Sequence, residues 1–476
     1  MILASCAPGL PGPGGGARAV APSAGEPWSP ARLPRDTVTD LPPAPVSPEV
    51  MARRDALTLT DVVDVALRNS PTTRIAWRNA RAAAASYGSA RGTWLPTVNG
   101  AVSASDVRTA GAGGQTAVQQ QLWGPSASFT WLLFDFSRPS LVGAARQALI
   151  AANWTHNAAV QDVVLQVGQA YYSYAAAKAL LVAQRATQAE ADTNLAAAEE
   201  RRRVGVATIA DVLQARTAAA QARLEVQRTE GTVAATRGAL AVATGYPATA
   251  DFDVDSLAAE GPIGPIADSV EALIALARAS RPDLGAALAT AAQARAQAHA
   301  ALGRRLPALT ATGNAARTYL STSNDPRESY NIGVGLSVPL FNGFSWEYDA
   351  QAARERAAAQ EARAQQLGQQ AVLQVFTDYY ALRTATANVR TVEDLYASAS
   401  QAADAARGRY RAGVGSLLEL LTAEAALGSA RATRVQSRLE WHLALLQLAH
   451  DVGVLDPRGG HPFRVLPDTT STGPSR

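Results

Sequence analysis

The sequence predicts an α+β membrane protein in which long α-helical hairpins, arranged as a tandem repeat, are joined to short β-strands. Three observations indicate this fold class: an internal duplication, Ala-rich helical stretches of unusual length, and short segments in which apolar and polar residues alternate. The 476-residue chain is 47% hydrophobic, but only 6% of it is aromatic. Much of the apolar content is Ala, and such sequence suits long helices that pack closely.

The duplication is visible in four landmarks. Ser70-Pro71 and Arg281-Pro282 are each followed 25 residues later by a Leu-Pro pair. A Phe comes next in each copy, and a Gly then follows it after 71 residues in the first copy and 72 in the second. The residues are Leu95, Phe134 and Gly205 in the first copy and Leu306, Phe341 and Gly413 in the second. A fixed period of this kind indicates a repeat architecture.

The repeat gives the domain boundaries. We expect a leader at 1–50, a first repeat at 57–245, a linker at 246–268, a second repeat at 269–453 and a flexible tail at 454–476. The leader is rich in Pro and Gly, which argues against a packed core there.

Each repeat is expected to begin with a short helix that ends just before a Pro, since the residue before Pro disfavours the helical region. A helix of about 20 residues leads to the Leu-Pro pair. After the strands, one helix of about 60 residues runs to Gly205 or Gly413, a span of about 90 Å. A returning helix of up to about 40 residues completes the unit. Helices this long need partners to be stable, which a cytosolic coiled-coil rod would also supply.

The alternating segments distinguish the chain from such a rod. From Tyr330 to Leu340 the even positions are apolar and the odd ones small or polar, and the first copy shows the same pattern at Ala127–Leu133. The partner strands after Leu95 and Leu306 alternate more weakly. Strands with one apolar and one polar face are typical of transmembrane β-barrels, although a soluble hairpin packed on a helix would look similar. The polar stretches Asp106–Trp123 and Arg317–Ser329 are expected to be surface loops.

Four strands per chain cannot close a barrel, and lipid tolerates no open sheet edge. About eight strands are the smallest number that can close, so the chain must oligomerise. A dimer would give eight strands around a filled interior. A trimer would give twelve strands around a water-filled lumen.

Other classes of function find no support in the sequence. The net charge is +3, with acids scattered among the bases, so no nucleic-acid footprint is indicated. The five His show no ligand spacing, and no phosphate-binding loop, HExxH motif or nucleophile elbow is present. No run of 18 or more apolar residues suggests a transmembrane helix. We therefore expect no enzyme activity, no metal and no cofactor.

Cys6 is the only cysteine, so no disulfide can form within the chain. It ends the tetrapeptide Leu3-Ala4-Ser5-Cys6, which matches the bacterial lipobox. A complete signal would need a basic region and an apolar core upstream, and only five residues precede Cys6. Either the start is misplaced or the match is accidental.

Taken together, the duplication, the Leu-Pro and Leu-Phe-(Asp/Asn) landmarks and the two Gly-centred turns resemble the TolC-like outer-membrane efflux and secretion channels of Gram-negative bacteria. The resemblance covers about residues 57–455. It implies a homotrimer with a twelve-stranded barrel in the outer membrane and a periplasmic barrel of twelve helices. It also implies a passive exit duct for drugs, other small molecules or secreted substrates, supplied by an inner-membrane pump through a periplasmic adaptor. Cys6 resembles the lipid-anchored branch that works with resistance-nodulation-division pumps.

The resemblance also assigns roles to residues around the two glycines. The adaptor-docking tips would comprise Arg203, Val204, Gly205 and Thr208 in the first copy, and Arg411, Ala412, Gly413 and Ser416 in the second. The periplasmic gate would comprise the constriction acid Glu419 and a link between Tyr410 and Asp211. A second acid of the family is replaced by Thr422, and an Arg of the family's lock is replaced by Gly415.

The alternatives are an exit channel of type I protein secretion, a non-channel periplasmic coiled-coil protein, and a periplasmic adaptor. An adaptor should carry one helical hairpin and soluble β-domains, so the two complete repeats count against it.

Overall fold

The computed structural model describes residues 57–109, 118–250, 253–254, 263–321 and 323–455. The leader with Cys6, and the tail beyond residue 455, lie outside the described residues. The chain divides into two units, Met1–Pro45 and Val46–Arg476. All the described residues belong to the second unit.

The described elements repeat one order twice: two helices, two strands, and a long helical hairpin. In the first copy these are α2 (Leu59–Asn69), α3 (Pro71–Gly92), β1 (Thr97–Thr109), β2 (Val118–Phe134), α4 (Arg138–Arg203) and α5 (Ile209–Ala243). In the second they are α6 (Val270–Ser280), α7 (Pro282–Gly303), β3 (Ala308–Leu320), β4 (Ser323–Ser337), α8 (Ser345–Arg411) and α9 (Leu417–Val452). The predicted sequence of elements is confirmed in both copies.

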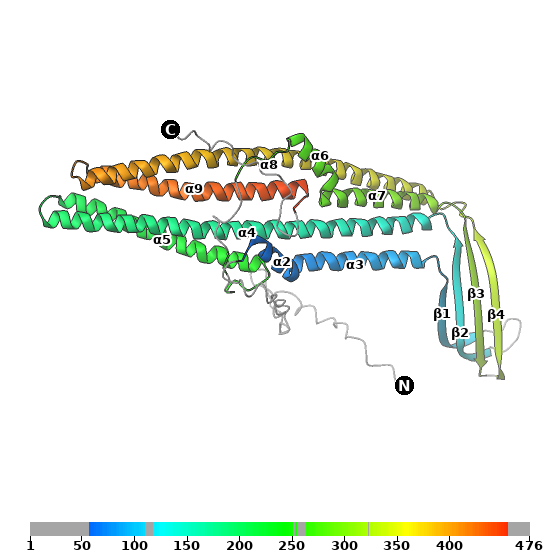
Figure 1. The fold of residues 1–476 in the computed structure, drawn as a ribbon. Coiled ribbons are helices and arrows are strands. Elements are labelled where there is room, and N and C mark those ends of the chain that lie inside the picture. The colour runs from blue at the N-terminus through cyan, green and yellow to red at the C-terminus, as the bar shows by residue number, and fades with distance from the viewer. Residues whose placement is uncertain (1–56, 110–117, 251–252, 255–262, 322, 456–476) are drawn as a thin grey trace. The chain divides into compact units, whose positions relative to one another are not determined.

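The long helices match the predicted lengths, with 66 residues in α4 and 67 in α8. Each pairs with its returning helix, and α4 also packs on α7 and α9. Figure 1 shows the two hairpin turns together at one end of the helices and the sheet at the other. Residues of the two repeats are therefore neighbours at both ends.

Local sequence explains where the short helices begin and end. Thr58 caps α2 through a capping box with Asp61. Ser70 ends α2 with a non-helical backbone and caps α3, which starts at Pro71. Arg281 has an extended backbone before Pro282, which starts α7. A Pro at the first helical position has no amide proton to leave unbonded.

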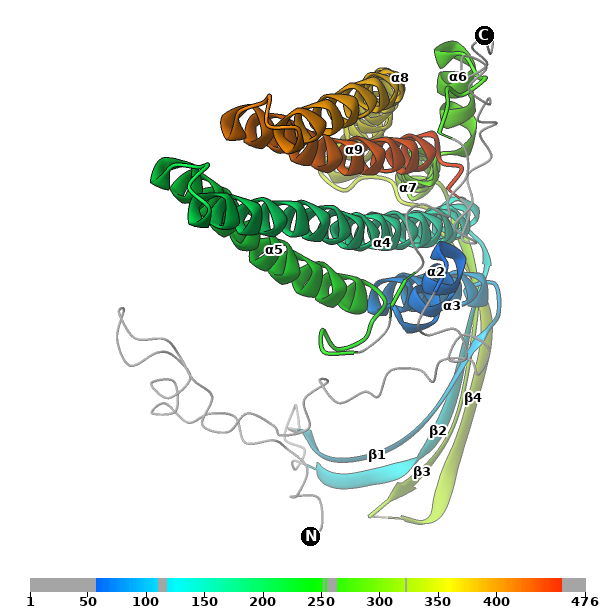
Figure 2. The same cartoon turned by 60° about the vertical axis from the view of Figure 1, so that its left-hand side comes forward.

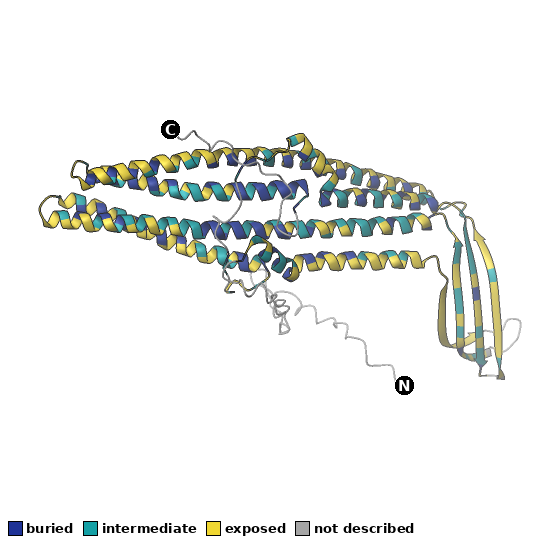
Figure 3. Ribbon diagram, in the orientation of Figure 1, coloured by how far each residue is buried: buried dark blue, intermediate teal, exposed yellow. Residues whose placement is uncertain are grey.

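The main core lies between the short helices α2 and α6 and the long helices, and it draws on the middle of α4 and α8, the end of α5 and the second half of α9. Its fully buried members include Val63, Val167, Leu240 and Leu448. Figure 3 shows this concentration of buried residues, and shows α3 and the outer strands β1 and β4 as mainly exposed. Along the hairpins the buried positions are mostly Ala, because the helices approach closely there.

The predicted linker is partly built into this core. Val254 is buried, and Leu57 forms a parallel β-bridge with it. The side chain of Asp253 accepts from the Lys178 ammonium at 2.7 Å and from the Tyr174 hydroxyl at 3.0 Å. Burial alone would raise the pKa of Asp253, but Lys178 and these hydrogen bonds hold it below its usual range.

The strands form one antiparallel sheet in the order β1-β2-β3-β4. The register sorts the side chains onto two faces. One face carries apolar residues opposite one another: Val98 and Phe129, Trp131 and Ala311, Val334 and Ala311, Ile332 and Gly313. The other carries polar or small pairs: Asn99 and Ser128, Thr130 and Thr312, Asn314 and Asn331. The alternation expected from single strands thus extends across all four strands in the part of the sheet nearer the helices.

The sheet is visibly curved, as Figure 2 shows. Aromatic residues lie on the apolar face at two levels. Near the helices, the indole nitrogen of Trp131 donates to the carbonyl of Trp94 at 2.9 Å. Nearer the far end, Trp123 stacks on Tyr319 with 4.3 Å between ring centroids.

The strands extend further than expected from the sequence. Asp106 pairs with Gln121, and Arg317 pairs with Glu328, so the expected loops Asp106–Trp123 and Arg317–Ser329 are wrong in extent. Polarity alone does not end a strand, because the backbone ladder can continue past the apolar band.

Candidate functional site

Both hairpin tips are built by the same backbone turn. The amide of Val206 donates to the carbonyl of Arg201 at 2.9 Å, and Val414 donates to Arg409 at 3.0 Å. These bonds, and the positive φ of Gly205 (84°) and Gly413 (76°), define a Schellman turn, which favours Gly at the left-handed position. The interruption of both helices therefore has a local cause.

A side-chain cap restarts the chain as a helix after each turn. The Thr208 hydroxyl accepts from the amide of Asp211, and the Asp211 carboxylate accepts from the amide and hydroxyl of Thr208, both at 2.8 Å. These hydrogen bonds lower the pKa of Asp211. In the second tip, Ser416 accepts from the amide of Glu419 at 3.1 Å.

The predicted tip residues lie where the sequence placed them. Val204 and Ala412 end α4 and α8, each followed by its Gly. Arg203 is exposed and pairs with Glu200, its Nε donating at 2.7 Å. Arg411 lies in the last turn of α8. All of them surround the two turns.

The predicted gate residues have different partners from those expected. Tyr410 is buried, with 7% of its surface exposed, in a cluster with Ala198, Val212 and Leu420 from the other three helices. Among the described residues, no hydrogen bond joins Tyr410 to Asp211, whose carboxylate bonds to Thr208 instead. The guanidinium of Arg201 lies over the Tyr410 ring, 4.0 Å from its centroid.

Glu419 is partly exposed on α9 and pairs with Arg409, with 3.4 Å between Nη1 and Oε1. Gly415, the position of the missing Arg, is crowded. A Cβ there would lie 3.0 Å from the Cβ of Arg409 and 3.1 Å from the amide nitrogen of Tyr410. The backbone of this turn therefore disfavours any side chain at position 415.

Exposed apolar side chains surround both turns. Val206 is 72% exposed and Val414 is 70% exposed, and Ile209, Leu213 and Leu418 are exposed beside them. Of the apolar tip residues, the sequence had singled out only Val204 and Ala412. The sequence does indicate these residues, since a Val follows the tip Gly in both copies.

Further from the tips, an ion-pair cluster connects the two hairpins. Arg431 on α9 makes two hydrogen bonds with Glu190 on α4, at 2.8 and 2.9 Å. Arg407 on α8 lies 3.6 Å from Glu190 and 3.4 Å from Glu424. Glu424 is 7% exposed and also bonds to Asn194. Burial raises the pKa of Glu424, Glu190 acts in the same direction, and Arg407 opposes both.

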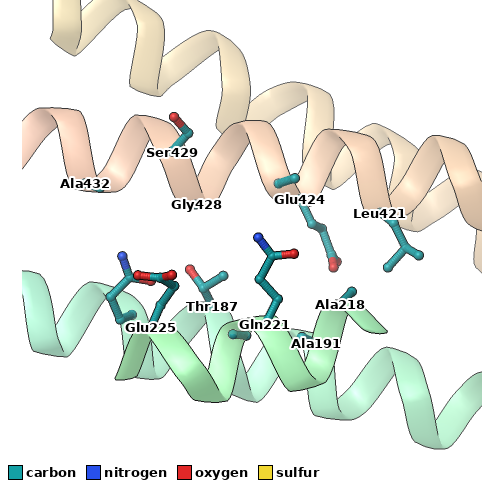
Figure 4. A pocket seen from close by; sticks show the side chains of 13 residues that line it. Thr187, Ala191, Ala218, Gln221, Glu225, Leu421, Glu424, Gly428, Ser429 and Ala432 are labelled. Carbon is teal, nitrogen blue, oxygen red and sulfur yellow. The ribbon is translucent and has the colours of Figure 1, made fainter. Parts of the chain in front are cut away.

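Next to this cluster, a groove of about 400 Å³ lies among α4, α5 and α9. Its walls are mostly small residues, among them Ala191, Ala218 and Gly428. Figure 4 shows Glu424 and Gln221 extending from opposite walls of this groove.

Within the part of the chain that the structure describes, no helix is both long and apolar enough to cross a membrane. The same residues include no group of three or more His, Cys, Asp or Glu placed to hold a metal ion.

Comparisons with known proteins agree with this architecture. The chain is 30% identical to Protein CyaE of Bordetella pertussis over 412 residues, which cover 84% of this chain and 85% of that protein. It is 25% identical to the outer membrane protein TolC of Vibrio cholerae, covering 83% and 91%. Among solved structures, the outer-membrane channel OprN aligns with a TM-score of 0.75 at 20% identity, covering 83% and 89%. The CmeC channel of Campylobacter jejuni aligns at 0.73 and 19%, covering 83% and 85%.

The fold, two long helical hairpins joined to a small antiparallel sheet, is that of outer-membrane channels. The sequence pattern of the outer membrane efflux protein family matches residues 62–246 and 273–454, one segment for each repeat. The chain belongs to this family. It is an outer-membrane exit channel for efflux or secretion, in a family of channels rather than enzymes.

Proposed function

We propose that three copies of this chain form a homotrimer. Their sheets close a twelve-stranded β-barrel in the outer membrane, and their hairpins continue it as a periplasmic α-barrel. The sheet order leaves one edge of β1 and one edge of β4 without a partner among the described residues. Pairing β4 of one copy with β1 of the next satisfies both edges around a ring.

The exposed helix faces support the same arrangement. Exposed apolar residues occur on α3 (Ile75 and Trp77) and on α8 (Leu373 and Phe376), and Figure 1 draws these two helices on opposite sides of the helical layer. Apolar surface on two different helices suits a head-to-tail contact between neighbouring copies.

Three copies are preferred to two because of the barrel interior. Eight strands enclose little more than their own side chains. Twelve strands leave room for solutes, and the polar face of this sheet would line that space. The mass of the detergent-solubilised protein distinguishes the two, with three chains expected and two chains contradicting the proposal.

The transported substrates are drugs or other small molecules, passed on by an inner-membrane pump through a periplasmic adaptor. Two relatives from Pseudomonas putida, each 27% identical over 421 residues, are named for antibiotic and toluene efflux pumps. The adaptor would dock on the tips, where exposed Val206 and Val414 adjoin Arg203 and Arg411. The lipobox-like Cys6 would add a lipid anchor.

The periplasmic gate lies at the same tips. By symmetry, Glu419 would form a ring of three carboxylates that favours cations. Asp211 contributes by fixing the start of α5 through its cap on Thr208. Tyr410 contributes through its burial between the hairpins.

The observation that carries this proposal is the continuity, in one chain, of a curved sheet with one apolar face and hairpins whose tips are apolar. Purified protein should need detergent for extraction and should form discrete pores in planar bilayers. Extraction without detergent, or correctly processed protein that forms no pores, would favour a structural coiled-coil protein.

A strain that lacks the gene tests which class of substrate the channel transports. Loss of the gene should make cells more sensitive to toluene or antibiotics. Unchanged sensitivity with loss of a secreted protein would instead support an exit channel of type I secretion.

A further inference from the structure

One side chain connects the tips of the two hairpins directly. Arg201 lies in the last turn of α4, and Tyr410 lies in the last turn of α8. The guanidinium carbon is 4.0 Å from the centroid of the Tyr410 ring, and Nη2 donates to the Tyr410 backbone carbonyl at 2.7 Å. The same side chain therefore holds both the ring and the backbone of the other hairpin.

The chemistry of this contact suits arginine. A guanidinium is planar, so it can lie over an aromatic face while one N–H donates at its edge. The Tyr410 carbonyl belongs to the last turn of α8, where carbonyl oxygens carry partial negative charge and attract cations. Since the ring is buried, the contact is partly shielded from water, which strengthens it.

The duplication shows that this contact is not merely part of the turn. Arg201 stands four residues before Gly205, as Arg409 stands four residues before Gly413. Arg409 pairs within its own hairpin with Glu419. The counterpart of Tyr410 in the first copy is Arg202, which is exposed. Two equivalent arginines thus have different partners, and of these two only Arg201 contacts the other hairpin.

Two other ways of holding the tips together are not used in this structure. The carboxylate of Asp211 is engaged by Thr208. A Cβ at position 415 would crowd the backbone of Arg409 and Tyr410 in the present turn. Among the described residues, no carboxylate pairs with Arg201, so its charge is directed to the ring and the carbonyl.

We propose that Arg201 is the residue that positions the two tips of each protomer for closure, by bracing the second hairpin through Tyr410. This inference rests on the proposed gate at the tips. Opening a pore lined by these hairpins requires the hairpins to move relative to each other, and the brace opposes that movement. Arg201 is a positioning residue, since it acts through Tyr410.

The test compares single-channel conductance of purified protein in planar bilayers. Arg201→Ala should lower the ratio of closed to open states about tenfold. Arg201→Lys should restore closure only in part, because an ammonium keeps the charge without the planar fork. The neighbouring Arg202→Ala, which removes an exposed arginine from the same turn, should behave as wild type.

Two substitutions at Tyr410 distinguish the contact with Arg201 from a hydrogen bond made by the Tyr410 hydroxyl. Tyr410→Phe keeps the ring and the carbonyl, so it should stay closed. Tyr410→Leu removes the ring face and should open the channel, with no further effect when combined with Arg201→Ala. If Tyr410→Phe opens the channel and Arg201→Ala leaves it as closed as wild type, the proposed role of Arg201 is wrong. A bond from the Tyr410 hydroxyl would then hold the tips instead.

The experiments distinguish failure of the proposed role of Arg201 from failure of the proposed channel. If the wild-type protein and all variants form no pores, the channel proposal fails. If the wild type conducts and Arg201→Ala is equally closed, only the brace fails. Oligomer mass and thermal unfolding of each variant identify any that fail to fold, and Arg201→Gln, which keeps an N–H donor, then replaces Arg201→Ala.

Discussion

At the scale of single residues, Glu419 and Arg409 form a pair whose members should act on ions in opposite directions. Their side chains are separated by 3.4 Å and both are partly exposed, so water and salt weaken the attraction. In the proposed trimer, Arg409 would offset part of the negative field of a Glu419 ring.

Glu419→Gln should therefore reduce cation selectivity and block by polycations, measured from reversal potentials and single-channel currents. Arg409→Gln should raise the same selectivity. Unchanged selectivity in both variants would exclude this pair from the gate.

Another group of charged residues lies at the base of the second hairpin. Asp451 is buried and is bonded by His450 at 2.8 Å, and the other nitrogen of His450 contacts Asp162 on α4 at 2.9 Å. Burial, and then the neighbouring Asp451, raise the pKa of Asp378 on α8 to about 7. Arg281, which is held by Asp283, and His450 oppose that rise.

The directions of these pKa shifts predict that the folded protein is less stable at alkaline pH. Asp378 has its pKa raised above the usual 3.8, so the stability it contributes is lost as pH rises from about 4 through about 7. His450 also has a raised pKa, despite the opposing effect of burial, because Asp451 and Asp162 bond to it. Its contribution is likewise lost at higher pH. The pKa of Asp451 is lowered, so the stability that this group contributes is lost only as the pH falls into the acid range.

Asp378→Asn keeps a neutral group beside Asp451 at every pH. We expect this variant to unfold at a higher temperature than wild type at pH 8, by the equivalent of about 2–4 kcal/mol, and to differ little at pH 4. Asp394→Asn, an exposed change on the same helix, provides the control. A difference that is the same at both pH values would contradict the assignment.

At the scale of elements, the caps determine how firmly the returning helices begin. Thr208→Ala removes a capping box and should cost about 1 kcal/mol locally. Hydrogen exchange in the first turn of α5 should become faster, whereas Thr208→Ser should restore protection. Thr217→Ala removes a hydroxyl that donates to the Leu213 carbonyl, and it should leave that turn unchanged.

The elements also show what could be read from sequence. Helix ends were predictable because Pro71, Pro282 and the tip glycines act locally. Strand ends were not, because Asp106 and Arg317 are polar residues whose place in the ladder depends on partners. The burial of Val254 was also missed, since a short apolar stretch in a linker carries no periodic signal.

The two tip glycines followed from the repeat, and the other tip residues followed from the family resemblance, but their partners did not. Arg201 and Tyr410 are 209 residues apart, and Glu190 and Arg431 are 241 apart. Contacts across such distances depend on how the hairpins pack, which a single sequence does not specify. The pairing of Asp211 with Thr208 was not predicted, because an Asp at this position is compatible both with capping a helix and with the gate of the family.

At the scale of the whole molecule, the proposed barrel assigns opposite surroundings to neighbouring residues of β4. Ile332 faces the same side as Gly313, its partner in β3, on the apolar face, whereas Asn331 pairs with Asn314 on the polar face. Lipid would cover the first face and water the second.

Ile332→Arg should destabilise membrane insertion by about 2–4 kcal/mol and lower the yield of trimers recovered from outer membranes. Asn331→Arg, one residue away, should insert with nearly normal yield. Equal yields would mean that the two faces of the sheet do not differ in their contact with lipid.

Lys178 has a practical consequence. It is the only lysine in the 476 residues, and its ammonium is held against Asp253 with about a third of the side chain exposed. An amine-reactive reagent therefore has one side-chain target in the entire chain, in addition to any free amino terminus. The rate of modification at Lys178 then reports how often its ammonium leaves the Asp253 carboxylate, without any engineered label.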